Sequence, residues 1–174
     1  MIKPAIALCL LVQVCAADPE LTLSMRASAT YETYLDQDGT GYQLAVGAGL
    51  AMGDKLVGVE VAVSDYDSRN APGQTLHHAA RGIYLAGERH FGPIGLGLAL
   101  GMAHHEITRE FADGTAPEPD EVVWRPAARI SVGVTVVTID QHALEIVAAV
   151  ERVPSGDPDT TLFFGLGYRF TGGF

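Results

Sequence analysis

The sequence has 174 residues, which is about the size of one domain, and a formal net charge of −10 at neutral pH. So acidic a chain is a poor candidate for nucleic-acid binding, because phosphate backbones attract basic surfaces. Its 20 glycines argue against a helical bundle, since a glycine inside a helix costs up to about 1 kcal/mol relative to alanine.

The first 17 residues have the pattern of a secretory signal peptide. Lys3 precedes an apolar run over residues 5–14, and small residues follow up to Ala17, where we expect cleavage. The run is too short to span a bilayer as a helix. Both cysteines of the sequence fall inside this segment. Residues 18–174 are therefore expected to form one domain without disulfides or cysteine metal ligands.

The rest of the chain alternates apolar and small or polar residues, which is typical of β-strands. In the first stretch, Leu23 and Met25 share one face while Ser24 and Arg26 share the other. The predicted strands span residues 21–31, 42–52, 57–63, 79–89, 94–103, 122–136, 144–151 and 160–170. Pro126 interrupts the sixth, where proline predicts a sheet edge or a bulge.

The predicted connections alternate in length. Short turns are expected at residues 53–55, 90–93 and 139–141, and longer polar loops at residues 36–41, 65–78, 105–121 and 153–159. Short turns at one end and long loops at the other are typical of up-and-down strands in a membrane with two different sides.

The two faces of the predicted strands differ in a way that favours a membrane. One face is continuously apolar, and the other consists of Gly, Ala and Ser with a few charges. The predicted fold class is all-β, an eight-stranded antiparallel up-and-down transmembrane β-barrel, whose narrow interior side chains can fill. We expect a charge network in this lumen, formed by Arg26, Glu60, Glu88, Arg125, Arg129, Glu145, Glu151 and Arg169. The alternative is a soluble periplasmic lipocalin-like binder with the faces reversed.

The end of the sequence supports a family resemblance. Gly165, Tyr168 and Phe170 resemble the C-terminal signal that outer-membrane barrels present to the barrel-assembly machinery, with Phe174 as an alternative terminal aromatic. The whole chain after the signal peptide resembles the small eight-stranded outer-membrane barrels of Gram-negative bacteria, the OmpA transmembrane domain, OmpX and opacity-protein type. This resemblance implies an outer-membrane location, with outer-membrane lipids, lipopolysaccharide and the barrel-assembly machinery as partners.

Aromatic residues cluster near both ends of the predicted strands. Tyr31, Tyr34, Tyr42 and Trp124 lie toward the loops, whereas Phe91 lies toward the short turns. We expect them to form the two interfacial girdles of a membrane barrel.

The sequence contains no complete catalytic set, and we expect no enzyme, cofactor or metal site. His104 and His105 are followed by no suitably placed serine, and His142 lies at a short turn. Adjacent histidines in a strand point to opposite faces, so the pair His77 and His78 supplies at most one ligand to a given site.

The resemblance and the loops together suggest a structural or adhesin-like surface-interaction role. The segments 65–67 and 113–121 are acidic and are candidates for contact with an extracellular partner. Two alternatives stay open, a narrow outer-membrane channel and a barrel enzyme that modifies lipid A.

Overall fold

A computed structural model describes residues 20–34, 37–71, 74–111, 118–154 and 160–172. Within these ranges, eight strands follow one another along the chain. They are β1 (Glu20–Tyr34), β2 (Gln37–Met52), β3 (Lys55–Ala71), β4 (Gln74–Phe91), β5 (Ile94–Phe111), β6 (Glu118–Ile139), β7 (His142–Arg152) and β8 (Thr160–Gly172). No helix among the described residues is long and apolar enough to cross a membrane.

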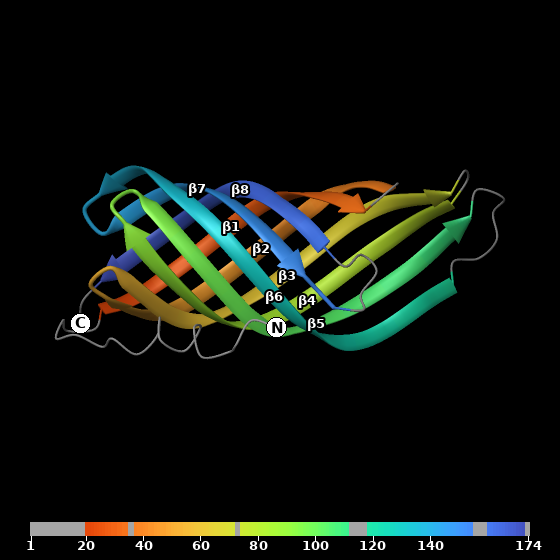
Figure 1. Cartoon of the computed structure of the whole chain (residues 1–174), viewed down its shortest axis with the longest axis horizontal. Helices are drawn as coiled ribbons and strands as arrows, with labels where there is room; N and C mark the ends of the chain where they lie inside the picture. Colours follow the sequence, from red (N-terminus) through yellow and green to blue (C-terminus); the bar gives the residue numbers. More distant parts are fainter. Residues whose placement is uncertain (1–19, 35–36, 72–73, 112–117, 155–159, 173–174) are drawn as a thin grey trace, which may run out of the picture.

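The strands form a closed antiparallel barrel in sequence order (Figure 1). Each strand pairs with the next, and β8 closes the barrel against β1, where Met25 faces Tyr168. Closure leaves the backbone of the central wall hydrogen-bonded on both sides, as a sheet in lipid requires. The predicted fold class is confirmed.

The alternation of side chains separates an apolar outside from a small and polar inside. The neighbours Arg129 and Ile130 of β6 show this, because Arg129 is 3% exposed and Ile130 is 64% exposed. Leu98 and Val132 lie outside like Ile130, while Ala99 and Ser131 lie inside. Small inward residues leave room in the narrow interior for the few long charged side chains.

Three tight turns close one end of the barrel. Gly53 and Gly92 have positive φ angles of 63° and 62°, and Asp140 has a φ of 52°. Glycine adopts this left-handed region without strain, and aspartate tolerates it better than most residues. These turns lie where the sequence predicted short connections, so this end is called the turn side and the opposite end the loop side.

Three of the four predicted long loops, 36–41, 65–78 and 105–121, are largely wrong, because strands occupy most of their described residues, whereas residues 155–159 of the fourth lie outside the described part. Strand β2 already begins at Gln37, β3 continues to Ala71 and β4 starts at Gln74. Likewise, β5 continues to Phe111, and β6 starts at Glu118. Polar composition suggested loops, but ladder hydrogen bonds need no apolar side chains, and a hairpin can continue into water with both faces polar.

Strands β3 to β6 reach farthest on the loop side, as Figure 1 shows. Pairing between β6 and β7 ends at Ala128 and Arg152, so residues 118–127 of β6 pair with β5 alone. Pro126 lies in this one-sided segment, exposed and without a register shift. Of the two predicted settings for Pro126, the structure therefore shows a sheet edge and no bulge.

Candidate functional site

The lumen holds the buried charged side chains, and they form two networks. Each network has one arginine that contacts two glutamates across the barrel. The mid-barrel network is built around Arg129 of β6, and the turn-side network is built around Arg169 of β8.

In the mid-barrel network, Arg129 is almost fully buried. Its Nη2 forms an ion pair with Glu60 of β3, and its Nη1 lies 3.7 Å from Oε2 of Glu151. Nη1 also donates a hydrogen bond of 3.3 Å to the amide oxygen of Gln43. The guanidinium carbon lies 4.8 Å from the ring centre of Tyr84, in a cation–π contact. Four strands besides β6 thus supply partners for this one cation.

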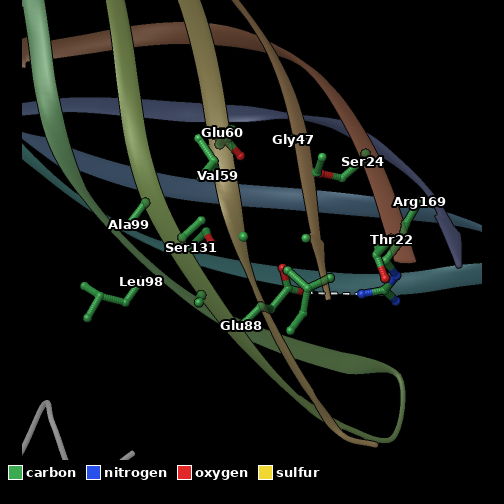
Figure 2. A pocket seen from close by; sticks show the side chains of 18 of the residues that line it. Thr22, Ser24, Gly47, Val59, Glu60, Glu88, Leu98, Ala99, Ser131 and Arg169 are labelled. Atoms are coloured by element: carbon green, nitrogen blue, oxygen red, sulfur yellow. Dashed lines mark hydrogen bonds and ion pairs between the residues drawn. The ribbon is translucent and has the colours of Figure 1, made fainter. Parts of the chain in front are cut away.

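The turn-side network joins three strands. Arg169 Nη2 lies 2.7 Å from Oε1 of Glu145 on β7, and Nη1 donates to Oε1 of Glu88 on β4 at 3.4 Å, the dashed line in Figure 2. His90 follows Glu88 on the same face of β4, and its Nε2 lies 2.8 Å from Oε1 of Glu88. His90 also contacts Arg169 Nη1.

These two networks leave little free space between them. The cavity that Glu60, Glu88, Arg129, Glu145 and Arg169 share has a volume of about 30 Å³, which holds about one water molecule. Its other walls are mostly small residues, of which Figure 2 shows Ser24, Gly47, Ala99 and Ser131. The lumen described here is therefore filled by side chains.

Two wider cavities open on the turn side. Their volumes are about 620 and 490 Å³, and both reach Glu20, His90, Arg169 and Thr171. The turn-side network therefore forms the inner wall of an entrance at this end of the barrel.

Histidines on the loop side point in opposite directions, as predicted for adjacent residues in a strand. His78 and His105 are buried in the lumen, whereas His77 and His104 lie outside. Leu76, Phe163 and Val153 are also buried at this end and make it more apolar than the turn side. Burial, together with the nearby His105, lowers the pKa of His78 to about 4.

His77 connects three strands on the outer face. Its Nδ1 lies 2.5 Å from Oδ1 of Asp67 on β3, and its Nε2 lies 2.9 Å from Oε2 of Glu110 on β5. These carboxylates, Glu110 foremost, raise the pKa of His77 above its usual value. An imidazolium between two carboxylates ties the projecting strands together.

The structure places the predicted lumen residues as follows. Glu60, Glu151 and Arg129 meet in the mid-barrel network, and Glu88, Glu145 and Arg169 meet in the turn-side network. Arg125 lies in register with the buried Ala103, nearer the loop side. The side chain of Arg26 lies outside the part of the molecule that the structure describes.

The structure describes the side chains of some of the predicted girdle and signal residues and not of others. Tyr42 and Trp124 are exposed on the outer wall toward the loop side, and Trp124 packs edge-on against His104 at 5.2 Å. Phe91 and Tyr168 are exposed toward the turn side, and Phe170 packs against His142 at 5.2 Å. Gly165 lies within β8. The side chains of Tyr31 and Tyr34, and the whole of Phe174, fall outside the described part.

Sequence reasoning missed three members of the networks, Gln43, Tyr84 and His90. His90 was assigned to a turn, although it follows Glu88 by two residues and so shares its face. The same alternation puts Gln43 in line with Ala45 on the inner face of β2. The alternation already put Gln43 and Tyr84 on the inner face, although not in the charge network, and continuing the period of two by one residue past Arg89 would have added His90.

No protein-family model and no curated protein matches the chain. Among solved structures, it is similar to Neisserial surface protein A, with a TM-score of 0.53 and 14% identity over 87% of this chain and 96% of that one. It is also similar to Ail, the attachment invasion locus protein of Yersinia pestis, solved with the heparin analogue sucrose octasulfate. That match has a TM-score of 0.52 and 15% identity over 88% of this chain and 99% of that one.

A third similar structure is Ail of Yersinia pestis in a phospholipid bilayer nanodisc, with a TM-score of 0.52, 14% identity, and coverage of 88% of this chain and all of that one. Identities this low establish the fold and leave function to the site itself. The chain has the fold of the small eight-stranded outer-membrane β-barrels.

Proposed function

We propose that this protein is a non-conducting outer-membrane barrel that presents a rigid β-sheet surface to extracellular partners. Its wall contacts outer-membrane lipids and lipopolysaccharide, and its C-terminal strand is read by the barrel-assembly machinery. The observation that carries the surface role is the extension of β3 to β6 beyond the other strands on the loop side.

The outer face of this extension is acidic and ordered by side-chain contacts. Asp65, Asp67, Glu106 and Glu110 are exposed there, and His77 joins Asp67 to Glu110. A partner that recognises this face therefore needs a basic surface. The attachment role in the name of Ail supports a surface function, but the heparin analogue bound to Ail is an anion, which an acidic face would repel.

The filled lumen supports the absence of conduction. Ions would have to pass both arginine networks, which leave a cavity of only about 30 Å³ between them. We expect no channel steps when the refolded protein is added to a planar lipid bilayer. Regular steps would favour the narrow-channel alternative.

The enzyme alternative is tested separately. If the protein does not modify lipid A, its expression should leave the mass of lipid A unchanged, whereas a mass shift would favour a barrel enzyme.

The surface role is tested by shortening the projecting sheet. Ser64 and Ala80 face each other in the β3–β4 ladder, so residues 65–79 can be replaced by Asn-Gly, a two-residue hairpin turn, which removes Asp65, Asp67 and His77 from the acidic face. Cells that display the full protein should adhere to immobilised basic extracellular-matrix proteins, and the shortened variant should not. The control places Asn-Gly at residues 53–54, in a turn at the opposite end. Equal adhesion by all three would contradict the role.

A further inference from the structure

The turn-side network contains a set of metal-ligand side chains from opposite walls of the barrel. One ligand atom from each of Glu88, His90 and Glu145 lies within 4.8 Å of the others, which within the described ranges is the one such group of three. Glu88 and His90 come from β4, and Glu145 comes from β7. The guanidinium of Arg169 contacts all three.

The donors are spaced nearly as a metal ion requires. Zinc–ligand bonds of about 2.1 Å put neighbouring donors in a tetrahedral site roughly 3.4 Å apart. His90 Nε2 and Glu88 Oε1 are 2.8 Å apart, and the widest separation in the group is at most 4.8 Å. A movement of about 1 Å at the ends of flexible glutamate side chains completes the arrangement.

Glycines leave the space that these side chains occupy. A Cβ atom at Gly95 of β5 would lie 2.5 Å from Glu88 Oε1 and 3.0 Å from His90 Cε1. A Cβ at Gly133 or Gly167 would lie 3.6 Å from Glu145 Oε2. The ligand atoms thus lie next to glycine backbone on three strands, β5, β6 and β8, which leaves room for them.

Charge and access also favour a cation. Two carboxylates face one guanidinium, so with a neutral imidazole the network carries one surplus negative charge in a mostly buried place. A divalent ion bound by the two carboxylates would balance them fully. His90 and Arg169 line both wide turn-side cavities, so an ion can reach the ligands and the arginine side chain can withdraw into water.

We propose that Glu88, His90 and Glu145 bind a divalent transition metal ion, with zinc as the best fit, and that Arg169 is the resident cation which the metal displaces. Imidazole with two carboxylates suits zinc and its neighbours, whereas magnesium and calcium prefer sites made only of oxygen. This site goes beyond the surface role and does not depend on it. It differs from the expectation from sequence that the chain has no metal site, and the titration below decides between the two.

The test is a zinc titration of the refolded barrel in detergent, followed by calorimetry and by the visible spectrum of the cobalt form. The wild type should bind one zinc ion, and calcium or magnesium at the same concentration should not compete. His90→Gln should weaken zinc binding by at least about tenfold. Arg169→Gln should tighten it by about the same factor, because the competing cation is gone. A purely structural role for Arg169 would not produce this gain.

Controls keep the result interpretable. His77→Gln removes an exposed histidine that also lies between two carboxylates, and it should bind zinc as the wild type does. Each variant is checked for folding by its gel mobility before and after boiling. If Arg169→Gln does not fold, Arg169→Lys replaces it, since a single ammonium cannot bridge both glutamates as well. No binding by the wild type, or binding lost in His77→Gln and kept in His90→Gln, would overturn the proposal.

Discussion

Arg129 shows how one side chain depends on its partners inside the lumen. Removing one partner of a buried ion pair strongly destabilises a protein, because the remaining charge has neither water nor its counter-ion around it. Arg129 balances Glu60 and Glu151 together, and each of these is buried. Losing the arginine would leave two buried carboxylates without this counter-ion.

We therefore predict that Arg129→Leu lowers the free energy of unfolding by about 3 to 5 kcal/mol. Urea unfolding in lipid vesicles, followed by tryptophan fluorescence, measures this. Arg152→Leu is the control, because Arg152 is exposed and should change stability by less than about 0.5 kcal/mol. Similar losses in the two variants would mean that the mid-barrel network does not stabilise the barrel.

The neighbours His77 and His78 should respond to pH in opposite ways. The pKa of His77 is raised by Glu110 and Asp67, so its contribution to stability is full below the ordinary value of about 6.5 and is lost as pH rises through the higher folded value. The pKa of His78 is lowered to about 4, so folding favours its neutral form. Its contribution is present above about 6.5 and is lost as pH falls toward 4.

NMR titration of the two imidazole rings should show this divergence in the folded barrel. His77 should titrate above a free histidine and His78 below it, and Glu110→Gln should lower the pKa of His77 while leaving that of His78 nearly unchanged. Ring signals that titrate together near 6.5 would show that the two residues share one solvent-exposed environment, contrary to the structure.

At the scale of the strand, the assignment of faces determines what each position tolerates. Leu98 lies on the outer face of β5, and Ile130 faces it on β6. We predict that Leu98→Arg costs about 2 to 4 kcal/mol of stability in lipid, because it places a charge near the middle of the bilayer. Ile139→Arg, at the turn-side end of β6, should cost only about 0 to 1 kcal/mol. Urea titration in vesicles compares the two, and equal effects would contradict the placement of the apolar band.

The strand patterns also show which features can be read from the sequence. Period-two alternation predicted the faces, so Leu98 was expected outside and Glu88 inside. It did not predict how far the strands continue, because the turn-forming and charged residues near Asp67 and Glu110 are equally compatible with loops. The grouping of the charges was hidden for another reason. Which glutamate meets Arg129 depends on the stagger of strands around the closed barrel, and that stagger is not a local property.

For the molecule as a whole, the central prediction is a closed barrel that resists detergent. Protein refolded in detergent should migrate differently on a gel before and after boiling, because the closed ladder survives until heat breaks it. The native protein should fractionate with the outer membrane. A single band unchanged by boiling, found in a soluble periplasmic fraction, would instead favour the lipocalin-like alternative.

The ion pairs in the lumen join strands that are far apart in the chain, and this has a consequence for assembly. Glu60 and Arg129 are 69 positions apart, and Glu88 and Arg169 are 81 apart, so neither pair can form before strands far apart in the chain have come together. A half-built barrel that lacks β6 and β8 would hold Glu60 and Glu88 without these arginines and must keep them in water. Strand β8 brings both Arg169 and closure, so the final step is expected to be all-or-none, and a chain that stops before β8 cannot seal its interior.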